Sequence, residues 1–165
     1  NLEEAPFFTT EKMGSFIHAK SLHDAGVHVL GMICYEMIGY FSDEPGSQKF
    51  PSEEVAKIYP DTGNYIVVVG IEKCRRFNAL VHGLMLESNE IAVERIDFPD
   101  SNELAARSDQ RNYWKFDYDA LMINDTSFMR NPNYHLASDT IDTLDFDKMT
   151  GVVSSCYHAI THLDP

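Results

Sequence analysis

Three side chains that lie far apart in the sequence have the types and positions expected of ligands for a metal ion. Glu4 directly precedes Ala5-Pro6, Glu36 follows a nearly continuous apolar run, and His135 lies in a loop of turn-forming residues. Two carboxylates and one imidazole form a donor set that suits zinc. In open α/β sheets, ligands bind beyond the carboxyl ends of strands, so the two glutamates are expected at one edge of a sheet.

Each of these residues also has a structural explanation. The pair Glu3-Glu4 is typical of a solvated turn. A carboxylate at position 36 must be paired, and its partner can be a metal or one of the basic side chains. His135 differs from the other six histidines, which fall on expected helices and one strand, because it lies in a loop beside Tyr134. Asp139 follows four residues later and is placed to orient the imidazole.

The elements expected to position these residues alternate between strands and helices. The first helix follows Thr9-Thr10-Glu11, runs through Leu22 and stops at Gly26. Hydrophobic periodicity predicts strands over 27–35, 64–70, 91–96 and 120–123, and further helices over 72–86, 110–116 and 146–162. This order predicts an α/β fold: a three-layer sandwich with a mixed, largely parallel central sheet flanked by helices.

Apolar patterning predicts which parts of these elements are buried. The segments 27–35 and 64–70 are apolar on both faces, which is typical of central strands covered on both sides. Two predicted helices each have one apolar stripe. In the helix over 72–86 the stripe is formed by Cys74, Phe77, Leu80, Val81 and Leu84. In the helix over 146–162 it is formed by Phe146, Met149, Val152, Val153, Cys156 and Ile160. Residues 42–63 have turn chemistry, with at most one helical turn near 53–58, and long loops of this kind tend to be functional.

Composition excludes several classes of protein. The 165 residues include 13 Lys and Arg against 26 Asp and Glu, a net charge of −13 that would repel nucleic acid and anionic membranes. The chain has three dispersed cysteines and no apolar run long enough to span a bilayer, and the pattern of its first residues does not predict a signal peptide. Because it begins with Asn rather than Met, we expect it to be cut from a longer protein, whose compartment the sequence does not indicate.

Three separated motifs resemble those of the two-zinc aminopeptidases, a family that includes bacterial leucyl aminopeptidases and glutaminyl cyclases. The segment 1–15, with Glu3-Glu4 and Met13-Gly14-Ser15, is similar to the family's Glu-Glu and Met-Gly-Ser motif. The strand 32–40 around Glu36 and the ending Tyr134-His135 through Asp145 are similar to two further motifs, in the same order. The resemblance spans essentially the whole chain and implies the C-terminal part of a zinc peptidase catalytic domain, one domain over residues 1–165.

The resemblance implies a role for each matched position. Glu3 corresponds to the general base and Tyr134 to a phenol that stabilises the oxyanion. Glu4 and His135 correspond to ligands of the first of two zinc ions and Glu36 to a ligand of the second. Substrate-binding positions are implied at Met37, Asp109, Gln110 and Arg130. The implied activity is hydrolysis that releases N-terminal amino acids from peptides with a free N-terminus.

Two departures from the family pattern qualify this expectation. The family's other two metal ligands, a histidine and a bridging aspartate, lie upstream of the Glu-Glu motif, where this chain begins. We therefore expect weak zinc binding and little hydrolysis by the chain alone, unless an N-terminal fragment or another copy completes the sheet. Gln110 replaces the histidine of the usual Ser-Asp-His motif. The alternatives are a non-catalytic binding module that keeps the peptidase fold, and a glutaminyl cyclase.

Overall fold

The computed structural model describes residues 7–163, so Glu3 and Glu4 lie outside the described residues. Five helices and four strands alternate along the chain: α1 (Gly14–Asp24), β1 (Met32–Tyr35), α2 (Glu53–Ala56), β2 (Ile66–Ile71), α3 (Arg75–Ser88), β3 (Val93–Phe98), α4 (Gln110–Trp114), β4 (Ala120–Asn124) and α5 (Phe146–His162). Three short 3-10 turns lie at Glu72–Cys74, Ser127–Met129 and Ile141–Thr143. None of the described helices is long and apolar enough to cross a membrane.

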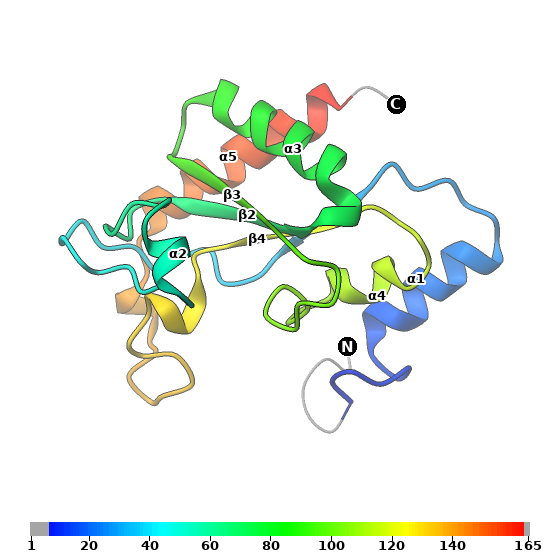
Figure 1. The fold of residues 1–165 in the computed structure, drawn as a ribbon, viewed down its shortest axis with the longest axis horizontal. Helices are drawn as coiled ribbons and strands as arrows, with labels where there is room; N and C mark the ends of the chain where they lie inside the picture. The colour runs from blue at the N-terminus through cyan, green and yellow to red at the C-terminus, as the bar shows by residue number, and fades with distance from the viewer. Residues whose placement is uncertain (1–6, 164–165) are drawn as a thin grey trace.

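The four strands form one mixed sheet in the order β1-β4-β2-β3. The pairs β1–β4 and β2–β3 are parallel, and β2 runs antiparallel to β4. Helices α3 and α5 cover one face of the sheet, and α4 and α1 lie on the other (Figure 1). The predicted class is therefore confirmed: a layered α/β fold with a mostly parallel central sheet.

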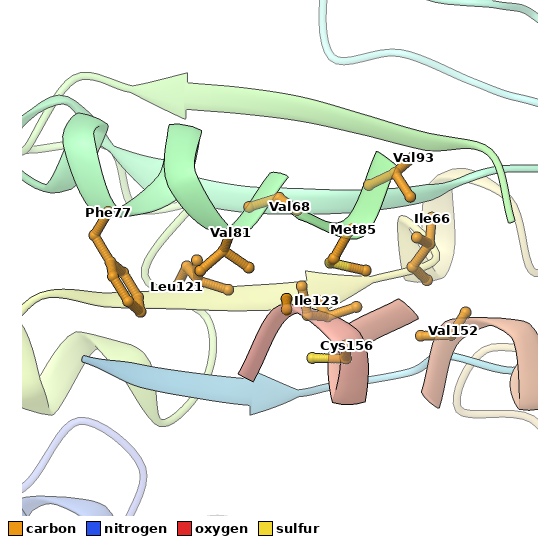
Figure 2. Packing of buried hydrophobic residues seen from close by; sticks show 11 residues of the cluster. Ile66, Val68, Phe77, Val81, Met85, Val93, Leu121, Ile123, Val152 and Cys156 are labelled. Atoms are coloured by element: carbon orange, nitrogen blue, oxygen red, sulfur yellow. The ribbon is translucent and has the colours of Figure 1, made fainter. Parts of the chain in front are cut away.

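The main hydrophobic core fills the space between the sheet and the helix pair α3 and α5 (Figure 2). The strands contribute the fully buried residues Ile66, Val68, Leu121 and Ile123, and the helices contribute Val81, Met85, Val152 and Cys156. This layer fixes the sheet, and the strand ends that carry the polar residues are fixed with it.

The strand expected over 27–35 is shorter than the sequence suggested and is not central. β1 covers only Met32–Tyr35 and lies at the end of the described sheet, where it pairs with β4 alone. The pairing begins at Met32 because its N–H donates to the Asp119 carbonyl, and the chain before Asp119 turns away at Asp117, which has a φ of 60°. In the described part of the chain, residues 27–31 therefore have no strand beside them, and Val27 and Leu30 are exposed.

The predicted helices form, but the faces that they bury differ from the predicted stripes. In α3, Leu80 is exposed, whereas Asn78 and Met85 are buried. In α5, the outward residues of the predicted stripe are Phe146, Val153 and Ile160, which are about half exposed. Each helix packs against both the sheet and the other helix, so its buried sector is rotated from the one that a single apolar stripe indicates.

The start of the first helix also differs from the prediction. α1 begins at Gly14, with Met13 as N-cap residue and no side-chain cap. The Thr10 hydroxyl instead donates to the Phe7 carbonyl at 2.6 Å, so the threonines form a turn ahead of the helix. The stop at Gly26 is confirmed, since this glycine has a φ of 65°.

Candidate active-site cleft

A cleft of about 820 Å³ lies beside the carboxyl ends of β1 and β4. Its floor is the sheet face opposite α3 and α5, where apolar side chains of three strands line it: Val67, Val69, Ile96, Phe98 and Met122. Its walls are the long loop before β2, the segment before α4 and the loop after β4. The cleft is lined by six of the residues singled out from the sequence: Glu36, Met37, Asp109, Tyr134, His135 and Asp139.

Glu36 is half-buried at the end of β1, and its environment is that of a positioned carboxylate. The Ser108 hydroxyl donates to Glu36 Oε2 at 2.7 Å. Ser108 is itself buried and lies 3.6 Å from the Cys34 thiol. No Lys, Arg or His among residues 7–163 forms an ion pair with Glu36, so a salt bridge does not explain this carboxylate within the described part of the chain.

His135 is held by aromatic stacking. Its ring stacks on that of Tyr134, with 3.9 Å between centroids and 14° between planes. The centroid of the Tyr134 ring lies 5.8 Å from that of Phe128. The Arg107 guanidinium lies over the Phe128 ring, with its Cζ 5.1 Å from the ring centroid. Since all four side chains line the cleft, this row links the loop after β4 to the segment that carries Ser108.

Asp139 has a different partner from the one expected. It was predicted to orient the His135 imidazole, but its Oδ1 accepts a hydrogen bond from Asn131 Nδ2 at 3.2 Å. Within residues 7–163, no hydrogen bond joins Asp139 to His135. The aspartate therefore fixes the loop that carries His135 rather than the imidazole itself.

Arg130 was expected to bind substrate, but it is only 5% exposed and does not line the cleft. Its Nε donates to Gln48 Oε1 at 2.9 Å, and its Nη1 donates to the Tyr65 carbonyl at 2.8 Å. Burial lowers the pKa of this guanidinium. Arg130 is thus a structural clamp between the long loop, β2 and the loop after β4.

Gln110 is also buried, with no exposed surface, and lies outside the lining of the cleft. Its Nε2 donates to the Ala105 carbonyl at 2.6 Å, which secures the segment ahead of α4. The structure therefore places Gln110 beneath the cleft wall and not on the surface of the cleft. Its side chain holds the backbone of the cleft wall in place through the hydrogen bond to Ala105.

A network of buried polar residues joins the two strand ends beneath the cleft. The Asn124 amide donates to the Glu36 carbonyl, and the Asp125 N–H donates to the Met37 carbonyl at 2.7 Å. The Asp125 carboxylate accepts from the backbone N–H groups of Tyr40 and Ser127, both at 2.9 Å. Burial raises the pKa of Asp125 to about 6, against the opposing effect of these N–H donors and of Arg130.

Backbone strain is concentrated around this cleft. Among the described residues, seven that are not glycine have a positive φ, and five of them line the cleft: Thr9, Met37, Thr126, Ser127 and His135. Such conformations cost free energy and persist where the surrounding structure holds them, commonly at functional sites. Met37, next to Glu36, and His135 itself are both among the five.

The described donors suit zinc in type but do not complete a site. Glu36 and His135 offer a carboxylate and an imidazole to the same cleft. Within residues 7–163, however, no group of three or more His, Cys, Asp or Glu side chains is arranged to hold a metal ion. Glu4, the third expected ligand, lies outside the described residues, so the predicted convergence of all three stays a prediction.

Sequence reasoning missed the supports of the site. Ser108 was noted only as part of a motif, and its bond to Glu36 joins residues 72 positions apart. Arg107 and Phe128 gave no signal, because a lone cation and a lone aromatic residue are common on any surface. The continuous apolar run over 64–70 predicted two covered faces for β2, but not which of them lines a cleft.

Comparison with known proteins shows one relative in sequence and several in fold. No known protein-family profile matches the chain. The uncharacterised protein YfbL of Escherichia coli (strain K12) is 42% identical over 153 residues, which make up 92% of this chain and 46% of YfbL. The chain therefore spans about half the length of the curated relative that it matches.

The similar solved structures include two bacterial aminopeptidases. Legionella pneumophila LapA matches with a TM-score of 0.62 and 18% identity, over 92% of this chain and 37% of LapA. LapB of the same organism matches with a TM-score of 0.63 and 14% identity, over 90% of this chain and 35% of LapB. An aminopeptidase from Aneurinibacillus sp. strain AM-1 matches with a TM-score of 0.55 and 18% identity, over 89% of this chain and 29% of the aminopeptidase. The chain has the fold of part of these aminopeptidases.

Proposed function

We propose that this chain is the C-terminal part of the catalytic domain of a zinc-dependent aminopeptidase, which releases N-terminal amino acids from peptides. One observation carries the proposal. Residues named from three separated segments of the sequence line a single cleft in a fold shared with bacterial aminopeptidases: Glu36, Asp109, and Tyr134 with His135 and Asp139.

Glu36 and His135 are the proposed metal ligands from the described part of the chain. Ser108 occupies Glu36 Oε2, so the carboxylate is oriented with its other oxygen available to the cleft. Stacking on Tyr134 holds the His135 imidazole at the rim. When bound, zinc lowers the pKa of a coordinated water to about 7 and polarises a substrate carbonyl. Glu4 is the proposed third ligand, by resemblance.

The remaining roles are assigned by resemblance and by position in the cleft. Glu3 is the proposed general base, which takes a proton from the attacking water and passes it to the leaving amine. The Tyr134 hydroxyl, which makes no hydrogen bond within residues 7–163, is the proposed donor to the developing oxyanion. Met37 and Asp109 line the same cleft and are proposed to contact the substrate.

The test uses the full-length polypeptide that carries this chain, with an aminoacyl p-nitroanilide as substrate. Glu3→Gln should lower kcat by about 10²- to 10⁴-fold and leave the zinc content unchanged, because a general base acts on water without binding the metal. Glu36→Gln and His135→Ala should lose zinc together with activity. Glu87→Gln, an exposed change on the opposite side of the sheet, is the matched control and should alter neither.

Two results would reject parts of this proposal. A wild-type protein that binds zinc but hydrolyses no peptide or aminoacyl substrate would be a non-catalytic binding module. Loss of zinc from the Glu3→Gln variant would make Glu3 a ligand and not the base.

A further inference from the structure

One basic side chain in the cleft has no partner among the described residues. The basic residues that line the cleft are Lys49, Arg107 and Arg111. The Lys49 ammonium donates to the Gly46 carbonyl at 3.1 Å, and Arg111 Nη1 donates to the Ala106 carbonyl at 2.9 Å. The exposed guanidinium of Arg107 forms neither an ion pair nor a hydrogen bond with any group in residues 7–163. Within this part of the chain, its N–H donors are free for a ligand.

Arg107 lies over an aromatic platform. A guanidinium over a ring face, as at Phe128, keeps its in-plane N–H groups free to donate. The Phe128 ring is 43% exposed, although burial of an aromatic ring is favourable. The two residues ahead of it, Thr126 and Ser127, have positive φ values of 74° and 43°. Two strained residues therefore hold an aromatic ring at the surface of the cleft, against the guanidinium.

This platform adjoins the groups proposed to carry out the reaction. The Phe128 ring lies between Arg107 and Tyr134, whose hydroxyl is the proposed donor to the oxyanion. The residue after Arg107, Ser108, donates to the proposed metal ligand Glu36. One residue extends a peptide by only about 3.3–3.6 Å, and an arginine side chain is long. A substrate group carried within one residue of the scissile bond is therefore within reach of Arg107.

The chemistry of a guanidinium selects a carboxylate. The group is always charged, and its planar fork binds the two oxygens of a carboxylate through parallel hydrogen bonds. The chain has 26 acidic residues against 13 Lys and Arg, and Glu103 and Asp109 line the same cleft. Neither of them forms an ion pair with Arg107. Arg107 therefore does not serve to neutralise an acidic side chain of the described cleft wall.

We infer that Arg107 is a specificity-determining residue, which binds a substrate carboxylate carried within one residue of the scissile bond. This inference rests on the proposed aminopeptidase function. Two kinds of substrate supply such a carboxylate: an N-terminal Glu or Asp carries it on the side chain, and a dipeptide carries it at the C-terminus. Phe128 supports the guanidinium, and the bond from Arg111 to the Ala106 carbonyl fixes the adjoining backbone.

The experiment measures kcat/KM of the full-length polypeptide on two matched pairs of substrates. Glutamyl and glutaminyl p-nitroanilide differ only in the side-chain carboxylate, and the dipeptide Leu-Gly and its C-terminal amide differ only in the terminal carboxylate. The charged member of one pair should be preferred by about 10- to 100-fold, the range expected of a hydrogen bond to a charged group. The pair that shows the preference identifies the source of the carboxylate.

Three variants assign this preference to the guanidinium. Arg107→Gln should bring the ratio close to one, and Arg107→Lys, which keeps the charge but not the planar fork, should give an intermediate ratio. Arg76→Gln changes an exposed arginine of α3, on the other face of the sheet, and is the matched control that should keep the wild-type ratio. Because each ratio compares two substrates of one sample, partial unfolding of a variant does not alter it.

The inference and the proposed function fail in different ways. Hydrolysis without a preference for either carboxylate, or a preference that Arg107→Gln retains, overturns the inference and leaves the proposed function intact. If no substrate is hydrolysed, the proposed function is wrong, and calorimetric titration with Leu-Gly, its amide, glutamic acid amide and glutamine amide gives the same comparison as affinities. Tighter binding of a carboxylate that Arg107→Gln abolishes would support the inference, and any other result would overturn it.

Discussion

Along β2, successive residues face two different environments. Ile66 and Val68 contact the helix pair α3 and α5 and are completely buried, whereas Val67 and Val69 form part of the cleft floor. β4 repeats the arrangement, with Leu121 on the helix side. The two faces of the sheet are equally apolar in sequence but are covered to different extents.

The supports of the two faces differ in the same way. The helix side is held by interdigitated apolar side chains, as Figure 2 shows. The cleft side has a smaller apolar cluster, to which Val67, Val69 and Met122 belong, together with buried polar groups in and around the strand ends: Gln48, Asn124, Asp125, Arg130 and Asn131. Both faces therefore stabilise the sheet by apolar packing, and hydrogen bonds of the polar groups hold the loops that surround the cleft.

The largest expected effect tests the helix side. Leu121→Ala should lower the free energy of unfolding by about 2–5 kcal/mol, because it leaves a closed cavity in the core. Met122→Ala, the next residue and part of the cleft floor, should cost only about 1–2 kcal/mol, since the space that it opens joins the cleft. Urea denaturation of both variants gives the comparison, and equal losses would contradict the difference between the faces.

The second prediction tests the polar support of the cleft through pH. The folded state raises the pKa of Asp125 from 3.8 to about 6, so between these values the folded protein retains a proton that the unfolded chain has released. The free energy of unfolding should therefore fall as pH rises from about 4 to about 6, by up to about 3 kcal/mol from this group.

Asp125→Asn removes this titration, although the amide cannot accept both N–H bonds and the variant should be less stable at every pH. The difference in unfolding free energy between wild type and variant should shrink as pH rises through the same window. Parallel curves from pH 4 to pH 7 would show that Asp125 does not titrate in this range.

A smaller effect is expected where the cleft wall orients a proposed ligand. Ser108→Ala removes the hydrogen bond to Glu36 Oε2 and should weaken zinc binding by the full-length protein about 10- to 100-fold, or about 1.4–2.8 kcal/mol. Calorimetric titration measures this. Ser138→Ala, at an exposed position in the His135 loop, is the control, and an equal effect from both variants would exclude a specific role for Ser108.

The smallest effect concerns a residue that the sequence pattern assigned to the core. Leu80 is exposed on α3, so Leu80→Gln should change the free energy of unfolding by less than about 0.5 kcal/mol. Val81→Ala, one residue further and fully buried, should cost clearly more. A large loss from the Leu80 variant would mean that this side of α3 is covered in solution.

The sequence predicted the elements because local patterns determine them. The helix over 146–162 has its predicted bounds, since Asp145 caps its first turn and apolar residues recur at helical spacing up to its end. β2, the short turn at Glu53–Ala56 and the alternation of strands and helices were likewise evident from local composition. The candidate residues Glu36, Tyr134 and His135 came from motifs, and the fold places them around one cleft.

Tertiary structure alone decided which partners these elements and residues have. The pattern of 27–35 could not show that β4 begins opposite Met32, and hence that β1 is short and lies at an edge. The sequence around Arg130 and Gln110 could not show that these side chains point into the protein. A polar side chain has the same local pattern whether it binds substrate or a distant backbone carbonyl. Burial and hydrogen-bond partners depend on contacts between residues far apart in the chain, and local periodicity does not encode them.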